Sequence, residues 1–229
     1  VGWDKGPFSN YYEPKHMVRN LERSLKNLKT DYVDLIYLHH CNFGKDGEYF
    51  DEALGVLTNF KNQGKLRFIG LSDWSNSRIM KYIKMCDPDV VQPYRNVMDD
   101  GFIKSGLCSY VNKNNLGVCF FSPIKHGLLT GKYDKPTSFE LGDHRSGVKD
   151  FANQKVIDKM KQNKLLLEKR FTKHKYPVMR GLVDALFNDA KSGCVLLGQR
   201  NVDQVNVAST LGEPMSNKDS VWVKSIYQH

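Results

Sequence analysis

The sequence predicts an α/β fold, with a parallel sheet covered by helices, and two observations support this prediction. Short apolar segments of about five to seven residues alternate with amphipathic segments, which is the pattern of strand–helix units. Several apolar segments also end in polar residues, as strands do when a site lies at their carboxyl ends. The run from Asp34 to Leu38 ends abruptly in His39 and His40, where an imidazole can polarise a substrate oxygen.

Helices and strands are expected to alternate through residue 96. Pro14 suits the first turn of a helix, and Met17 and Leu21 begin an apolar repeat at helical spacing that continues through Leu28. The expected elements are a helix from residue 13, a strand over 32–39, a helix over 48–62, a strand over 65–72, a helix over 77–86 and a strand at 90–92.

The alternation continues through the second half of the chain. The expected elements are a helix near residues 104–112, a strand over 116–122, two long polar helices over 153–173 and 177–191, a strand over 194–198 and a helix near 202–210. At 229 residues the chain can bury one sizeable core, so we expect a single domain over residues 1–229.

Composition narrows the classes of partner. The chain has 34 Lys plus Arg against 25 Asp plus Glu, a formal charge of +9, which suits an anionic cofactor or a nucleic acid. The basic residues are spread along the chain, which favours solvated helix faces, and aromatic residues are not interleaved with them as base stacking requires. Nucleic acid is therefore not an expected partner.

Membrane, disulfide and metal features are not expected either. No segment has the ~18 to 20 apolar residues that cross a bilayer, and no signal peptide is visible. The five cysteines have no CxxC spacing and no His/Cys cluster, so we expect neither a disulfide framework nor a metal site. A reducing compartment follows, with the cytoplasm as the default and an organelle matrix left open, because residues before Val1 could carry a targeting signal.

An open doubly wound sheet and a closed barrel both fit the alternation. No GxGxxG follows any expected strand, which weakens the dinucleotide-fingerprint form of the open sheet. Every expected strand has polar residues at its carboxyl end: His39-His40, Ser72-Asp73, Gln92 to Asn96, Ser122-Pro123 and Gly198-Gln199-Arg200.

Five segments, in order along the chain, resemble the aldo-keto reductase superfamily. The run Ser-Pro-x-x-x-Gly-Leu-Leu-Thr-Gly-Lys-Tyr, ending at Tyr133, is the strongest match. The five segments are Ser24 to His39, Gly64 to Trp74, Gln92 to Asn96, Phe121 to Tyr133 and Gly198 to Gln204. The resemblance implies a TIM (β/α)8-type barrel, of which about five of eight strand–helix units are present. It also implies NADP(H)-dependent reduction of a small carbonyl substrate by direct hydride transfer.

Residue roles follow from the resemblance. His39 takes the place of the catalytic histidine, Ser72, Asp73 and Gln92 fall where the nicotinamide carboxamide is held, and Phe121 falls where an aromatic ring stacks on the nicotinamide. Other residues would meet the cofactor's phosphates, with Arg200 favouring a 2′-phosphate and so NADP(H) over NAD(H). These residues are Ser122, Ile124, Gly127, Thr130, Gly131, Lys132, Arg200 and Gln204.

Several of these residues also have a purely structural interpretation. His39 can be a buried structural histidine and Phe121 a core residue, while Gln92 can close a turn before Pro93. Residues 130–133 can be a helix end capped by Gly131, and Arg200 can be a surface residue at a helix start.

Some positions depart from the family's pattern. Asp73 stands where the family commonly has asparagine, and Val207 and Ala208 replace residues that grip the adenine. These departures support an alternative function as a degenerate, non-catalytic structural or binding subunit of a larger complex.

The family's catalytic aspartate, tyrosine and lysine all precede the segment that matches residues 1–30, so we expect the chain by itself to be inactive. Three explanations stay open: an upstream segment that supplies them, a degenerate subunit whose open barrel edges a protein partner covers, or a local tyrosine as proton donor. The last is disfavoured because Tyr11 and Tyr12 lie in a polar loop.

Overall fold

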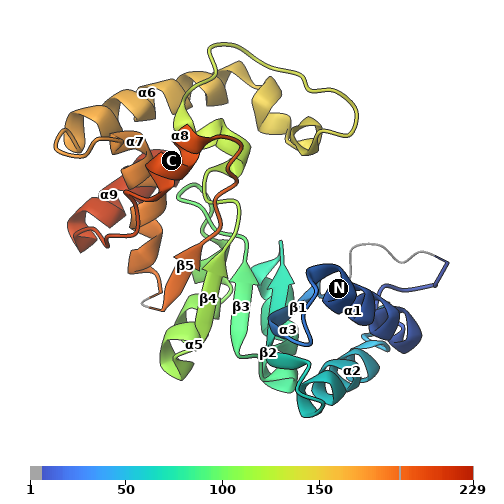
Figure 1. The fold of residues 1–229 in the computed structure, drawn as a ribbon. Coiled ribbons are helices and arrows are strands. Elements are labelled where there is room, and N and C mark those ends of the chain that lie inside the picture. The colour runs from blue at the N-terminus through green and yellow to red at the C-terminus, as the bar shows by residue number, and fades with distance from the viewer. Residues whose placement is uncertain (1–6, 191, 229) are drawn as a thin grey trace. The chain divides into compact units, whose positions relative to one another are not determined.

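The computed structural model describes residues 7–190 and 192–228, which form an α/β fold whose described part has five strands. The chain divides into two compact units (Figure 1). The described part of unit 1 is residues 7–93 and 103–119, and that of unit 2 is residues 94–102, 120–190 and 192–228. The α/β prediction is confirmed, whereas the single domain over residues 1–229 stays a prediction. The Val1 end of the chain lies outside the described residues.

Unit 1 is built on parallel strands in the order β1-β2-β3-β4, and α2 and α3 pack against β2 (Figure 1). Phe120, the last residue of β4, belongs to unit 2. The short helix α4 (Gly101–Lys104) has its first two residues in unit 2 and its last two in unit 1. The other elements are α1 (Pro14–Leu28), β1 (Val33–His39), α2 (Phe50–Asn62), β2 (Leu66–Asp73), α3 (Asn76–Cys86), β3 (Val90–Pro93), α5 (Leu107–Asn114) and β4 (Gly117–Phe120).

Local sequence explains where α1 begins and ends. Pro14 occupies the first helical position, where its missing N–H costs no helical hydrogen bond. Met17, Leu21 and Leu25 repeat at helical spacing and are buried, as the sequence predicts. The helix ends at Lys29, which adopts a left-handed conformation with φ of 55° and donates its N–H to the carbonyls of the last turn.

One glycine allows the strands of unit 1 to accommodate a large side chain. In the register of β1 and β2, Tyr37 lies opposite Gly70. A Cβ atom at Gly70 would lie 2.5 Å from the Tyr37 ring, too close for any other residue. The absence of a side chain at Gly70 therefore lets the tyrosine ring lie across the neighbouring strand.

Unit 2 is a helical cluster in which α6, α7 and α9 pack on one another (Figure 1). Its core includes Leu167 of α6, Leu182 of α7 and Val223 of α9, all buried. The elements are η1 (Lys125–Thr130), η2 (His144–Gly147), η3 (Lys149–Ala152), α6 (Gln154–Arg170), α7 (Pro177–Asp184), η4 (Ala185–Asn188), β5 (Gly193–Val195), α8 (Val202–Ala208) and α9 (Asn217–Gln228).

Some predicted boundaries are wrong. The helix expected over 104–112 is two helices, because Gly106 adopts a left-handed conformation with φ of 82° and starts α5 anew. The strands expected over 116–122 and 194–198 are shorter, as β4 and β5. Within the described residues no helix is long and apolar enough to cross a bilayer.

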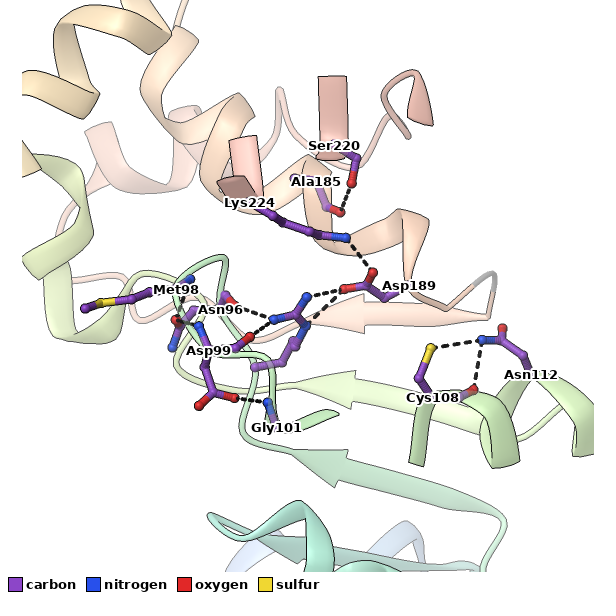
Figure 2. Close-up of polar contacts among 11 residues, drawn as sticks. Asn96, Met98, Asp99, Gly101, Cys108, Asn112, Ala185, Asp189, Ser220 and Lys224 are labelled. Atoms are coloured by element: carbon purple, nitrogen blue, oxygen red, sulfur yellow. Dashed lines mark hydrogen bonds and ion pairs between the residues drawn. The ribbon is translucent and has the colours of Figure 1, made fainter. Parts of the chain in front are cut away.

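The end of the chain departs most from the prediction. The long polar helix expected over 177–191 is a short buried helix, α7, followed by the 3-10 turn η4. The carbonyl of Ala185 accepts a hydrogen bond from Ser220 Oγ at 3.0 Å, and Asp189 binds Lys224 (Figure 2). Both partners lie on α9, a helix that the sequence reasoning missed, and its contacts explain why α7 and η4 are buried.

Candidate functional site

Three polar side chains predicted for the site lie in one row across the sheet of unit 1. In the parallel register His39 lies opposite Ser72, and Ser72 lies opposite Gln92. The Ser72 hydroxyl donates to Oε1 of Gln92 at 3.2 Å, and Nε2 of Gln92 lies 3.8 Å from Sγ of Cys119. The carboxyl ends of β1, β2 and β3 therefore place an imidazole, a hydroxyl and an amide side by side.

The electrostatic environment keeps His39 uncharged near neutral pH. The pKa of His39 is lowered to about 4, first by burial and then by the neighbouring His40, while Asp73 opposes the shift. The rings of His39 and His40 lie with their centroids 4.1 Å apart. A neutral imidazole has one N–H donor and one acceptor nitrogen, so His39 can donate a hydrogen bond without carrying charge.

The carboxylate of Asp73 binds backbone groups on both sides of it. Oδ2 accepts the N–H of Cys41 at 2.7 Å, and Oδ1 accepts the N–H of Ser75 at 2.6 Å. The side chain is 1% exposed, and Nη1 of Arg78 lies 3.9 Å from Oδ2. Asp73 thus joins the turn after β1 to the start of α3.

Tyr12 lies in the loop before α1, as expected, but its side chain is fully buried. Its hydroxyl lies 2.5 Å from the carbonyl oxygen of His39 and 2.5 Å from that of His40. Burial, with the nearby Cys41 and Asp73, raises the pKa of Tyr12 far above its ordinary value. The hydroxyl therefore stays protonated and donates to the backbone, a role that does not suit a proton donor to substrate.

In unit 2, Phe121 follows β4 and is half-buried. Its ring packs edge-on against Tyr94, with centroids 5.6 Å apart, and its carbonyl accepts the N–H of Arg95 at 3.1 Å. The ring therefore keeps part of its surface accessible, so neither a stacking role nor a core role is excluded by its burial.

The segment that follows Phe121 has an unusual backbone. Ser122, Lys125 and His126 adopt positive φ values of 57°, 46° and 55°, which cost non-glycine residues about 1–3 kcal/mol each. Gly131 ends η1 in the left-handed conformation, with φ of 67°, so the helix-cap geometry expected as the structural interpretation of this residue is present. Thr130 Oγ1 donates to the carbonyl of Gly127 at 2.7 Å.

This segment and the region after β5 line a cavity of about 560 Å³ in unit 2. The cavity brings together six residues predicted to meet phosphates, whereas Thr130 and Gly131 do not line it. The six are Ser122, Ile124, Gly127, Lys132, Arg200 and Gln204.

Four titratable residues that line this cavity were not singled out from the sequence: His126, inside the matched segment, and Asp143, His144 and Arg145, in the loop after it. Arg145 binds Asp143 through Nη2–Oδ2 at 2.5 Å, and this interaction holds the pKa of the Asp143 carboxyl well below its usual range. Burial lowers the pKa of His126, with a further contribution from His144. No regular pattern marks residues 143–145 in the sequence, so only the density of charged residues there could have indicated a site.

The chain after β5 positions Arg200 at the edge of the cavity. Asn201 caps α8 by accepting the N–H of Gln204 at 3.0 Å, and Oε1 of Gln204 accepts the N–H of Arg200 at 2.6 Å. Arg200 is exposed, directly before a helix start, as its structural interpretation expects, and Val207 and Ala208 lie half-buried on α8.

A model of the aldo/keto reductase family matches residues 3–213. The chain is 27% identical over 214 residues to the L-glyceraldehyde 3-phosphate reductase of Escherichia coli, covering 90% of this chain and 61% of the relative. It is 28% identical over 165 residues to a probable voltage-gated potassium channel subunit beta of Oryza sativa, covering 67% of this chain and 48% of the relative. The chain thus spans 61% or less of the length of these relatives.

Among solved structures, the chain is similar to the glycerol dehydrogenase of Gluconobacter oxydans. The TM-score is 0.79 at 25% identity, over 99% of this chain and 68% of the other. This likeness confirms the predicted fold class, that of the TIM-type barrels.

Proposed function

The chain belongs to the aldo/keto reductase family, and on that premise we propose that it takes part in NADP(H)-dependent reduction of a small carbonyl compound. The observation that carries the proposal is the row of His39, Ser72 and Gln92 at the carboxyl ends of β1, β2 and β3. In parallel α/β enzymes this edge of the sheet is where the chemistry takes place.

His39 is the residue proposed to act on the substrate. A neutral imidazole donates its N–H to the carbonyl oxygen, which polarises the carbonyl and stabilises the negative charge that develops on oxygen. The low pKa of His39, about 4, keeps this donor neutral through the physiological range. The cofactor supplies the hydride when it is bound.

The same row would hold the cofactor's carboxamide. The Ser72 hydroxyl and the Gln92 amide offer donors and acceptors at adjacent positions. Asp73 follows Ser72 at the end of β2, and its carboxylate accepts the backbone N–H of Cys41. In unit 2, Phe121 is the residue that the family resemblance assigns to the nicotinamide ring, and its half-buried aromatic side chain suits that role. Hydrogen bonds to the carboxamide fix the rotation of the nicotinamide, so that one face is presented for transfer.

The cavity of unit 2 fits the cofactor's phosphates. Lys132, Arg145 and Arg200 line it and carry positive charge, and the positive-φ segment from Ser122 to Gly127 forms another part of its wall. Thr130 and Gly131 support that backbone from the end of η1. A guanidinium pairs with a phosphate through two parallel N–H donors, so Arg200 favours a 2′-phosphate and NADP(H) over NAD(H).

Titration of the whole chain with NADPH, followed by nicotinamide fluorescence, tests this proposal. We expect the wild type to bind NADPH, and Arg200→Ala to weaken NADPH about tenfold, about 1.4 kcal/mol, while changing NADH binding little. Lys155→Ala, on the exposed side of α6, is the matched control. No binding at millimolar NADPH would contradict the proposed function, and equal losses for NADPH and NADH would contradict only the role of Arg200.

A degenerate structural or binding subunit is a second candidate, favoured by the likeness to potassium channel subunits. The Asp73 carboxylate, engaged by two backbone N–H groups, and Val207 and Ala208 on α8 are in keeping with it. This candidate predicts no NADPH binding and a stable complex with another protein in the cytoplasm. Sedimentation of the purified chain as a monodisperse monomer would count against it.

A further inference from the structure

The hydroxyl of Tyr12 has no part in the proposed chemistry, but it contacts the backbone at the end of β1. It lies 2.5 Å from two consecutive carbonyl oxygens, those of His39 and His40, which share its single proton. Tyr12 lies 27 residues before His39 in the chain, so this contact ties the segment before α1 to the end of β1.

The backbone that Tyr12 contacts is in a strained conformation. His40 has a φ of 63°, in the left-handed region that non-glycine residues rarely adopt. Such a conformation persists only where surrounding groups hold it. The structure supplies these groups: the N–H of His40 donates to the carbonyl of Ser72 at 2.8 Å, and the N–H of Cys41 donates to Oδ2 of Asp73 at 2.7 Å.

Core packing fixes the position of the Tyr12 hydroxyl. Its ring lies 4.5 Å from that of Phe43, centroid to centroid, and Phe43 packs in turn on Phe50 and Tyr82 at 5.0 and 4.8 Å. These rings come from α2, α3 and the loop that follows β1. Packing in this aromatic cluster therefore holds the Tyr12 hydroxyl against the backbone of the turn after β1.

We propose that Tyr12 is a positioning residue for His39: its hydroxyl, with Asp73, clamps residues 39–41 and so fixes the His39 imidazole in its half-buried place beside Ser72. The significance of the clamp for catalysis rests on the proposed function, in which His39 acts on the substrate. The clamp itself is independent of it. Among the described residues, the charged groups that act on the pKa of His39 are His40, which follows it at the end of β1, and Asp73, on β2.

Tyr12→Phe tests the clamp, because it removes the hydroxyl and keeps the ring that packs on Phe43. The measurement is the titration of the His39 side chain by NMR in histidine-labelled protein, with His39→Gln to assign the signal. We expect release of the turn to expose the imidazole, so that the pKa of His39 rises from about 4 toward 6.5. Tyr11→Phe, at the adjacent half-buried tyrosine, should leave it unchanged. An unchanged His39 titration in Tyr12→Phe would overturn the proposal.

A second variant covers the case in which Tyr12→Phe folds poorly. Glycine adopts positive φ without strain, so His40→Gly removes the need for the clamp. We expect Tyr12→Phe to lower the melting temperature less in the His40→Gly background than in the wild type, and an equal loss in both would refute the clamp. Neither measurement needs turnover or cofactor, so NADPH titration of the same variants separates failure of the clamp from failure of the proposed function.

Discussion

Arg95 and Asp189 lie 94 residues apart in the chain and form a buried ion pair within unit 2 (Figure 2). Nε and Nη2 of Arg95 both donate to Oδ2 of Asp189, at 3.0 and 2.7 Å. Oδ1 of the same carboxylate binds Nζ of Lys224 at 2.5 Å, and Nη1 of Arg95 donates to the carbonyls of Asn96 and Asp99. The Arg95 guanidinium and the Asp189 carboxylate together therefore join residues 94–102 to the end of η4 and to α9.

Arg95→Met is expected to lower the free energy of unfolding of unit 2 by about 3–5 kcal/mol, because it leaves the buried Asp189 carboxylate without its main partner. Arg67→Met is the control. Arg67 pairs with Asp34 at 2.7 Å, but both side chains are more than half exposed, so we expect a loss of at most about 1 kcal/mol. Urea unfolding followed by far-ultraviolet circular dichroism, which reports on the helices of both units, measures both variants. Equal losses would show that burial does not set the strength of the Arg95 pair.

The sequence could not reveal this ion pair, although Arg95 lies in a segment that resembles the family. Local periodicity places Arg95 just after a strand, but its partner follows a turn 94 residues later, and no local pattern links the two. The same limit explains the wrong prediction of a helix over 177–191. The residues after α7 contact α9, a helix that the sequence reasoning missed.

Where local rules decide the structure, the sequence was sufficient. Pro14 and the repeat of Met17, Leu21 and Leu25 predict α1, and the apolar run ending at His39 predicts β1. Tyr12 shows the opposite case. Its neighbours are polar, so the loop looks exposed, whereas tertiary packing on Phe43 buries the ring completely. Burial that comes from distant partners leaves no periodic signal.

Gly131→Ala should destabilise unit 2 for two separable reasons. Its φ of 67° strains any residue with a Cβ, and an added Cβ would lie 2.5 Å from the carbonyl oxygen of Met160. Gly64, with φ of 72°, has the same conformational demand but open space around its Cβ position. We expect a loss of about 1 kcal/mol for Gly64→Ala and about 3 kcal/mol for Gly131→Ala, measured by thermal unfolding. Similar losses would mean that the Met160 backbone moves aside freely.

Arg145→Ala tests the charge balance of the phosphate cavity. Without Arg145, the carboxylate of Asp143 loses its hydrogen-bonded cation and keeps only the charge of Arg200 acting on it, so it repels an anion in the cavity more strongly. We expect NADPH binding to weaken about tenfold in Arg145→Ala, about 1.4 kcal/mol, and to recover in large part in the double variant with Asp143→Asn. Isothermal titration calorimetry measures all three proteins. If the double variant binds no better than Arg145→Ala, Arg145 acts on the cofactor directly and not through Asp143.

The low pKa of His39 predicts how stability depends on pH. Burial and His40 lower this pKa from 6.5 to about 4 in the folded chain. Above pH 6.5 the imidazole is neutral in both the folded and the unfolded chain, so it contributes nothing to the pH dependence. As the pH falls from 6.5 to about 4, the unfolded chain takes up a proton that the folded chain does not, and the free energy of unfolding falls.

His39→Gln removes this titration, while the other titratable groups are common to both proteins. The difference in the free energy of unfolding between wild type and variant should therefore be constant at neutral pH and shift in favour of the variant as the solution is acidified. Urea unfolding at a series of pH values between about 4.5 and 7.5 measures it. A difference that does not change with pH would mean that the folded chain protonates His39 as readily as the unfolded chain does, which would remove the electrostatic basis for a neutral donor at this position.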